Sequence, residues 1–387
     1  MIAILRDRHL SAIVVSMLLV TGVFSVTTDA LADWPMFRAD AARSGGAPGV
    51  ELSDLAVVWA AELGGSVDSS PAVVGGRVYV GNSLGHMTAI SPTDGAIIWR
   101  FETNGAVVSS PSVVDGICIF GSVDGFVYAL DASTGAMRWC YRTRGPVISS
   151  PAVVDGRVVF GSIDGRLYAL SLSDGSLLWR TGAGAAIQAS PTVAEGLVLY
   201  GDDDAHLRAL NLSDGALVWE YQGSGKLVAA PAVGTDVAVF GVMGPSALRP
   251  PKLEYLIALR LQTGERLWAI EEAYSVLSAP LVHDGRVYFV TVEGYVSKTT
   301  ARAASLADGS ALWDRVLPGV VDSSMALVGA NLCFGCHDGR LYLLAAESGE
   351  IVDAESLAPK IFSSPAISDG RVYIGASDGR LYCLEQP

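Results

Sequence analysis

Two short clusters of side chains in this chain could do chemistry. The segment Cys333-Phe-Gly-Cys336-His337 has the Cys-x-x-Cys-His spacing through which c-type haem is attached covalently. Residues 202–204 are three consecutive aspartates, and carboxylate oxygens are the ligands that Ca²⁺ prefers. The first cluster would serve a haem redox centre and the second a calcium site, so both depend on the structural elements that carry them.

Both clusters lie inside copies of a repeat that runs through most of the chain. The repeat is almost intact from Ser149 to Trp179, and its eight copies are spaced by 40, 40, 40, 40, 49, 45 and 40 residues. A period near 40 residues is typical of β-propeller blades built from four short strands. The anchoring positions are Pro71, Pro111, Pro151, Pro191, Pro231, Pro280, Met325 and Pro365.

The register of the repeat argues against both metal centres. Gly335 aligns with the glycines that end the second strand of other copies, which places Cys333 in a strand and Cys336-His337 in a hairpin turn. Haem attachment there would require the blade to open, so we expect no haem c. The aspartates align with an ordinary turn of the third copy, residues 162–165, and we interpret them as a solvated turn between the second and third strands.

Composition and the two ends of the repeat array predict an all-β, eight-bladed propeller. Half the residues are apolar, and twelve Asp-Gly pairs supply the positive φ angles that tight hairpins need. The last copy ends at Gln386-Pro387 without its fourth strand, whereas Ser53–Trp59 matches the fourth-strand segment Thr93–Trp99. We therefore expect the strand after Ser53 to complete the last blade and close the ring, which removes two exposed sheet edges.

The first 32 residues differ from the rest. Arg6 and Arg8 precede an apolar run, and Ala30-Leu31-Ala32 offers small residues at a cleavage position, which is the pattern of a secretory signal peptide. The alternative is a retained membrane anchor. We predict a signal peptide at 1–32, a leader at 33–52 and the propeller at 53–387, with export to the periplasm or the medium and no membrane span in the mature chain.

The net charge of the chain excludes one class of binding partner. The formal charge of −14 would repel phosphate backbones, so we expect no nucleic acid to bind.

One repeat carries a family motif. Ala129-x-Asp131-x-x-Thr134-Gly135-x-x-x-Trp139 resembles the tryptophan-docking motif of pyrroloquinoline quinone (PQQ) type propellers, and residues 33–38 resemble the leader of secreted members. The resemblance implies that one tryptophan per blade packs against the neighbouring blade. These residues are Trp59, Trp99, Trp139, Trp179, Trp219, Trp268 and Trp313, whereas Asp353 takes this place in the seventh copy.

The resemblance leaves two functions open, because the family includes quinoprotein dehydrogenases and the BamB propeller of the outer-membrane barrel assembly machinery. Quinoproteins of this kind hold PQQ and Ca²⁺ beneath a disulfide between adjacent cysteines, and this chain has no Cys-Cys pair. We therefore predict a monomeric, non-catalytic scaffold that binds a protein or peptide, without catalytic residues, metal or cofactor. A small PQQ-binding oxidoreductase with calcium is the alternative.

Two insertions mark the expected binding surface. The fifth copy has nine extra residues around 241–255 and the sixth has five around 291–300, both between the second and third strands, so they should project from the same face of adjacent blades. The alternative is that each loop packs back on its own blade. The candidate binding residues are Met243, Leu248, Arg249, Lys252, Tyr255, Tyr295 and Lys298.

The centre of the ring is a second candidate site. The Ser-Ser-Pro segments should begin the innermost strands and surround the axis with hydroxyl groups, although crowding alone would also select small residues there. Trp34 and Phe37 of the leader suggest that this segment docks onto the ring.

Overall fold

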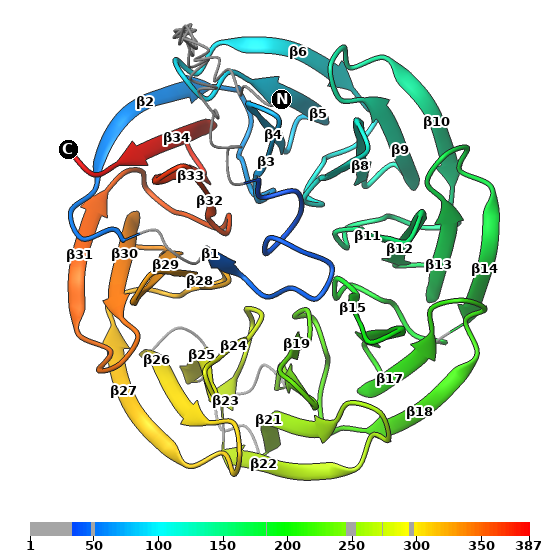
Figure 1. Cartoon of the computed structure of the whole chain (residues 1–387), viewed down its shortest axis with the longest axis vertical. Coiled ribbons are helices and arrows are strands. Elements are labelled where there is room, and N and C mark those ends of the chain that lie inside the picture. Colours follow the sequence, from blue (N-terminus) through cyan, green and yellow to red (C-terminus); the bar gives the residue numbers. More distant parts are fainter. Residues whose placement is uncertain (1–32, 48–50, 183, 245–252, 273, 294–297) are drawn as a thin grey trace, which may run out of the picture. The chain divides into compact units, whose positions relative to one another are not determined.

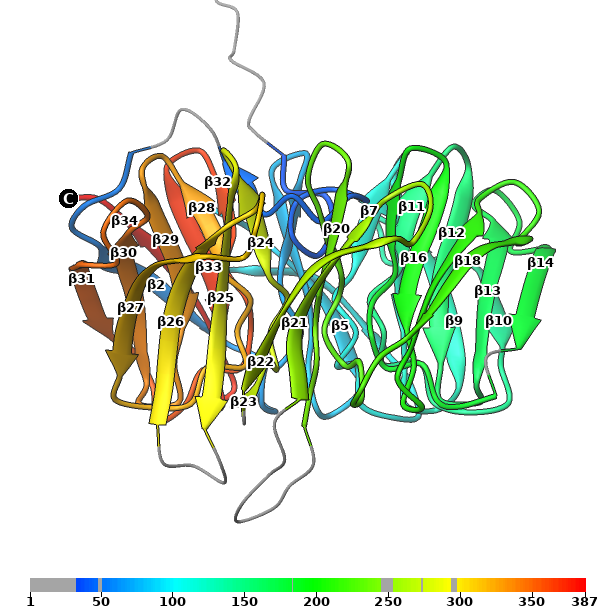
Figure 2. The same ribbon diagram turned by 90° about the horizontal axis from the view of Figure 1, so that it is seen from below.

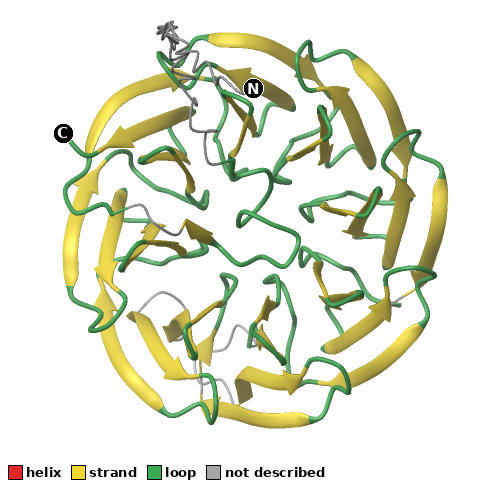
Figure 3. Cartoon of the chain, in the orientation of Figure 1, coloured by secondary structure: helices red, strands yellow, loops and turns green. Residues whose placement is uncertain are grey.

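The computed structural model describes residues 33–47, 51–182, 184–244, 253–272, 274–293 and 298–387. These residues contain no helix, and their strands form eight antiparallel sheets arranged as blades around an axis (Figures 1 and 3). The prediction of an eight-bladed propeller is confirmed. The predicted signal peptide lies outside the described residues, and none of the described segments is a helix long and apolar enough to span a bilayer.

In each blade the strands are given from the axis outward as A, B, C and D. Blades 1 to 4 consist of β3 (Ala72–Val74), β4 (Arg77–Gly81), β5 (His86–Ile90) and β6 (Ile97–Glu102); β7 (Ser112–Val114), β8 (Ile117–Gly121), β9 (Phe126–Asp131) and β10 (Met137–Arg142); β11 (Ala152–Val154), β12 (Arg157–Ser162), β13 (Arg166–Ser171) and β14 (Leu177–Gly182); and β15 (Thr192–Ala194), β16 (Leu197–Gly201), β17 (His206–Asn211) and β18 (Leu217–Gln222).

Blades 5 to 8 consist of β19 (Ala232–Val233), β20 (Val237–Gly241), β21 (Leu253–Arg260) and β22 (Arg266–Glu272); β24 (Leu281–His283), β25 (Arg286–Glu293), β26 (Lys298–Ser305) and β27 (Ala311–Leu317); β28 (Ala326–Val328), β29 (Asn331–Gly335), β30 (Arg340–Ala345) and β31 (Ile351–Ser356); and β32 (Ala366–Ser368), β33 (Arg371–Gly375), β34 (Arg380–Glu385) and β2 (Ala56–Glu62). Two short strands are added to this scheme: β1 (Gly46–Ala47) pairs with β28, and β23 (Tyr274–Ser275) pairs with β25.

The ring closes as the sequence predicts. Strand β2, from the start of the array, pairs antiparallel with β34 at the C-terminal end of the chain, with Ala60 opposite Tyr382. The two ends of the array therefore share one sheet, and blade 8 has four strands like the others.

One tryptophan on the D strand joins each of seven blades to the next. The indole nitrogen of Trp139, for example, donates to the carbonyl of Leu172 in blade 3 at 2.9 Å, and its ring lies against Gly175 of the same blade. A Cβ on Gly175 would lie 2.6 Å from that ring, and φ there is +71°, so the position needs glycine for two reasons. The other six indoles, of Trp59, Trp99, Trp179, Trp219, Trp268 and Trp313, make the equivalent bond.

The eighth junction is built differently because the ring closes there. The C and D strands of blade 8 come from opposite ends of the array, and Leu55 stands where the other blades have the docking glycine. Leu55 is 3% exposed and belongs to the hydrophobic cluster that includes blade 8. Asp353 occupies the tryptophan position in blade 7 and accepts the backbone N–H of Leu55 at 2.9 Å. The departure from the repeat thus follows from the break in the chain.

Candidate functional site

The leader lies across one end of the axial channel and ties several blades together (Figures 1 and 2). Four A strands donate a backbone N–H to it: Val73 to Trp34, Val113 to Pro35, Val193 to Ala41 and Leu327 to Gly45, all at 2.7–2.8 Å. The leader and the A–B and C–D turns lie at the same end of the ring. This end is called the leader face below. The expectation that the leader docks onto the ring is confirmed.

Arg43 is the main side-chain anchor of the leader. Its side chain is 1% exposed, and its guanidinium donates to the carbonyls of Ser150, Pro151, Pro191 and Phe37 at 2.7–3.2 Å. Burial lowers the pKa of Arg43 to about 9, which still leaves it charged at neutral pH. One cation thereby links the leader to the inner strands of blades 3 and 4.

Arg38 is equally buried but lacks this support. It is 3% exposed, and none of its three guanidinium nitrogens has a hydrogen-bond partner among the described residues. Burial lowers the pKa of Arg38 to about 10, and nearby Asp40 opposes that shift. Asp40 itself is bonded to the backbone and hydroxyl of Ser44. A buried, unpaired cation destabilises the folded state.

We expect substitution by methionine to change the stability of the fold in different ways at these two arginines. Arg43→Met leaves the carbonyls of Phe37, Ser150 and Pro191 without their donor, whereas that of Pro151 keeps the Ser112 hydroxyl, and it should lower the free energy of unfolding by about 2–3 kcal/mol. Arg38→Met removes an unpaired charge and should leave stability unchanged or raise it by about 1–2 kcal/mol. Thermal melts of both variants test this. A loss of the same size in both would contradict it.

The other end of the channel is the insertion face, where the B–C turns and the D–A connections lie. A mouth of about 210 Å³ opens there, lined by residues of all eight blades and by Phe37 of the leader. Its serines hold neighbouring blades together: the N–H of Ser70 donates to the Ser110 hydroxyl at 3.0 Å, and Ser110 bonds to Ser150 in the same way. These hydroxyls therefore have a structural role between blades.

The inner ring of serine bonds is interrupted at two blades. Ala230 and Ala279 replace the bonding serine in blades 5 and 6, so the N–H groups of blades 4 and 5 have no serine hydroxyl to donate to at these positions, whereas the N–H of Ala279 still donates to the Ser324 hydroxyl of blade 7 at 3.1 Å. The same two blades carry the insertions, and no leader backbone bond reaches either of them in the described part of the chain. The serine bonds of the inner ring are thus missing at the two junctions of blade 5, with blades 4 and 6.

The channel mouth does not fit a quinone held with calcium. Its charged lining residues are Asp68 and Asp322, in blades separated by blade 8, and its lining includes no lysine or arginine that could neutralise an anionic quinone. Asp322 pairs with His337 at 3.0 Å. Among the described residues no group of three or more His, Cys, Asp or Glu side chains could hold a metal ion, whereas Ca²⁺ needs several oxygen ligands that converge.

The Cys-x-x-Cys-His segment at 333–337 and the aspartates at 202–204 both contribute buried side chains to the fold. Cys333 and Cys336 are both fully buried, and burial raises the pKa of the Cys336 thiol to about 12. The interpretation of the aspartates as a solvated turn is wrong for Asp202, which is fully buried. It accepts the guanidinium of Arg208 at 2.6 Å and the backbone N–H groups of Asp204 and His206. His206 and Arg208 lie on the following C strand, β17, which the turn alignment did not take into account.

Both insertions lie between B and C strands, as predicted. In blade 6 most of the extra residues lengthen β25 and β26 into a longer hairpin, with Thr291 opposite Thr300, and β23 adds to its edge. In Figure 2 this hairpin ends at the opposite edge of the ring from β1. The blade 6 insertion is thus largely regular sheet.

The candidate binding residues fall into three groups. Leu248, Arg249, Lys252 and Tyr295 lie outside the described residues. Lys298 is exposed, whereas Met243 is half-buried and bridges to Lys226. Tyr255 is 1% exposed and packs against Tyr274 and Phe289, so it belongs to the core and is not available to a partner. Aromatic character alone did not separate a surface residue from a core residue.

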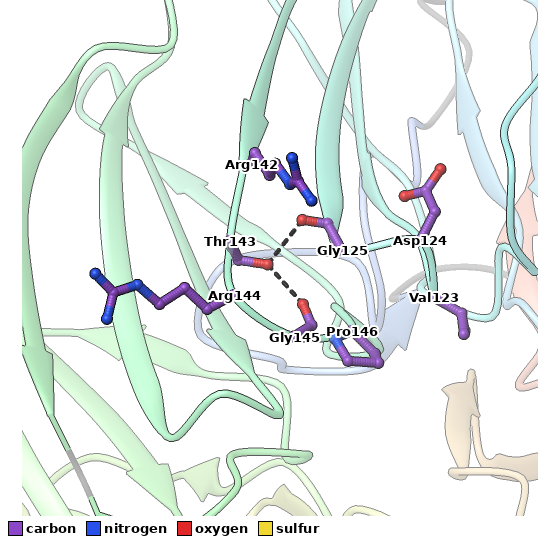
Figure 4. A pocket seen from close by; sticks show the side chains of 8 residues that line it. All are labelled: Val123, Asp124, Gly125, Arg142, Thr143, Arg144, Gly145 and Pro146. Atoms are coloured by element: carbon purple, nitrogen blue, oxygen red, sulfur yellow. Dashed lines mark hydrogen bonds between the residues drawn. The ribbon is translucent and has the colours of Figure 1, made fainter.

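The insertion face of blade 2 has a hollow that was not predicted from the sequence. It has a volume of about 530 Å³ and is lined by the B–C turn at residues 123–125 and by residues 142–146, which lead from β10 towards blade 3. The hydroxyl of Thr143 lies 2.8 Å from the carbonyl of Gly125 and 2.6 Å from that of Gly145 (Figure 4). These bonds hold the connection at 142–146 against the B–C turn. Arg142 and Arg144 project from opposite sides of this connection. One feature of the sequence could have indicated this site. Blade 2 has Arg142 and Arg144 at the positions where blade 1 has Glu102 and Asn104.

Comparison with known proteins settles the family. The family model described as outer membrane protein assembly factor BamB matches residues 50–149, 142–271 and 252–387, which is nearly the whole propeller. The chain belongs to the BamB family.

Individual relatives are distant. The outer membrane protein assembly factor BamB of Legionella pneumophila (strain Paris) is 28% identical over 141 residues, which is 33% of this chain and about a third (35%) of that protein. The crystal structure of BamB from Moraxella catarrhalis has a TM-score of 0.72 at 18% identity and covers 86% of this chain and all of its own. Quinohemoprotein alcohol dehydrogenase from Comamonas testosteroni has a TM-score of 0.74 at 16% identity, covering 92% of this chain and 81% of its own. At such identities the two structures show a shared fold only.

Proposed function

We propose that this protein is an exported, non-catalytic propeller scaffold that binds a protein partner during assembly of outer-membrane proteins. The observation that carries the proposal is the match of the BamB family model along the propeller. The channel supports it, because the leader occupies one end and the described lining at the other offers neither a cation for an anionic quinone nor converging metal ligands.

Location follows from the same proposal. The segment at 1–32 has the features of a secretory signal, and family membership suggests the bacterial envelope as the destination. A partner could dock on the insertion face, where blades 5 and 6 differ most from the repeat. We propose a monomer, since closure of the ring pairs the two ends of the array with each other and not with a second copy.

The alternative remains a small PQQ-dependent oxidoreductase, which the structural likeness to quinohemoprotein alcohol dehydrogenase favours at the level of the fold. One experiment separates the two proposals. The tagged full-length chain is cross-linked in the envelope of the cells that produce it, and the purified mature protein is titrated with PQQ and Ca²⁺ in a calorimeter. We expect cross-links to the outer-membrane assembly machinery and no PQQ binding. Stoichiometric, Ca²⁺-dependent binding of PQQ would overturn the scaffold proposal.

A further inference from the structure

Four arginines on blades 1 to 3 have no ionic partner. Arg100 lies in β6, Arg142 ends β10, Arg144 follows it and Arg180 lies in β14; all four side chains are exposed, and none forms an ion pair within the described part of the chain. These four residues are called the basic band. Strands β6, β10 and β14 are the outermost strands of consecutive blades (Figure 1), so Arg100, Arg142 and Arg180 lie on strands of the outer wall and Arg144 lies just after β10.

Elsewhere on the sheets arginines are mostly neutralised. Arg138 pairs with Asp131, Arg260 with Asp236 and Arg380 with Glu62. On a chain whose formal charge is −14, carboxylates are abundant, and a run of unpaired guanidinium groups is a departure from the prevailing pattern. An electrostatic feature of this kind steers and selects a partner of opposite charge.

The acids that lie near the band are already satisfied. In the hollow of blade 2, Asp124 accepts the backbone N–H groups of Asn104 and Phe126 and the hydroxyl of Tyr128. On the blade 3 side, Asp164 accepts the backbone N–H of Arg144 and the hydroxyl of Tyr168. Both carboxylates fix turns, Asp164 also pairs with Arg166 at 4.0 Å, and neither forms an ion pair with Arg142 or Arg144.

The two central arginines are arranged for an extended ligand. Arg142 is directed to the side of Gly125, where its guanidinium lies over the ring of Phe126 at 5.8 Å, and Arg144 extends to the opposite side of the connection (Figure 4). Stacking on an aromatic ring holds a guanidinium in place and leaves its N–H groups free for a carboxylate. A compact ion would meet one of the two, whereas an extended segment lying across the connection would meet both.

We propose that the basic band binds an extended acidic segment of the protein partner, with carboxylates on Arg142 and Arg144 and continuing contact along Arg100 and Arg180. The inference rests on the proposed function and adds the chemistry of the partner. A short peptide suits the site better than nucleic acid, because the net negative charge of the whole body repels a long polyanion.

The test uses a fluorescein-labelled peptide of eight glutamates and the purified mature protein, with fluorescence anisotropy as the readout. The double variant Arg142→Glu/Arg144→Glu should bind at least tenfold more weakly than the parent, and binding by the parent should weaken with added salt. The matched control is Arg340→Glu/Lys360→Glu on blades 7 and 8, which alters the net charge equally at exposed positions and should change affinity less than twofold. Circular dichroism melts confirm that both variants fold.

Three outcomes would overturn the proposal: no binding to the parent at millimolar peptide, an equal loss in the control, or tighter binding of a single-stranded oligonucleotide of equal length. The result is separable from that of the envelope cross-linking. If cross-links to the assembly machinery persist in the Arg142→Glu/Arg144→Glu variant, the scaffold proposal stands and the assignment of this surface fails. If the parent forms no such cross-links but still binds the peptide in an Arg142- and Arg144-dependent way, the reverse holds.

Discussion

A chain that ends at Gly379 is expected not to form a stable closed ring. The truncation removes β34, which pairs with β33 on one side and with β2 on the other, and it takes four buried side chains, Leu381 to Leu384, out of blade 8. Each large apolar side chain contributes roughly 1.5–3 kcal/mol by burial, so the loss approaches the entire net stability of a typical domain, about 5–15 kcal/mol. Strands β2 and β33 would also become unpaired edges that favour aggregation.

The control for this truncation is a chain that ends at Glu385, which lacks only the last two residues and retains all of β34. Size-exclusion chromatography and a thermal melt should show a monomer with a melting temperature close to that of the parent. The chain ending at Gly379 should be aggregated or lack a cooperative transition. A monomeric, cooperatively melting product of that truncation would mean that the β2–β34 pairing is not required for the fold.

Replacing Trp139 by alanine should lower the free energy of unfolding by about 3–5 kcal/mol. The indole is 8% exposed, packs on Gly175 and donates to the carbonyl of Leu172, so the substitution leaves a cavity and an unsatisfied acceptor between blades 2 and 3. Denaturant unfolding measures the loss, and an effect under 1 kcal/mol would contradict a role in joining the blades.

The same junction can be probed from the glycine. Gly175 and Gly156 both have φ near +70°, but a Cβ on Gly156 would meet nothing within 4 Å, whereas one on Gly175 would collide with the indole of Trp139. Gly156→Ala therefore measures the cost of the backbone conformation, and Gly175→Ala measures that cost plus the collision. We expect Gly175→Ala to be the more destabilising by at least about 1–2 kcal/mol. The excess should disappear when Trp139 is alanine, because the ring is then absent.

Much of the fold could be predicted because each blade repeats one local pattern. The Asp-Gly turns and the tryptophan positions recur every 40 residues in most copies, so agreement between copies identifies the strands. The match between the segments starting at Ser53 and Thr93 placed the closing strand, since similar segments at the same place in a repeat form the same strand. The position of both insertions between B and C strands followed from the same alignment.

The candidate site was harder to predict, because the repeat says little about residues that depart from it. Tyr255 follows an insertion and was expected at the surface, yet it packs in the core against β25 and the segment before blade 6. Asp202 was expected in solvent, yet Arg208 neutralises it in the interior. For both residues, burial depends on neighbours that the register of one copy does not specify.

The sequence by itself thus determined the number of blades, the strand that closes the ring and the tryptophans that join seven of the blades to the next, because short-range pattern and repetition encode them. Only the tertiary structure decided how the leader is held, where Arg43 bonds to carbonyls 107 and 148 residues away. It also decided which arginines find a carboxylate and which remain unpaired in the basic band. The physical reason is that pairing and burial depend on distances in space, and closing a ring brings together groups whose separation along the chain carries no signal.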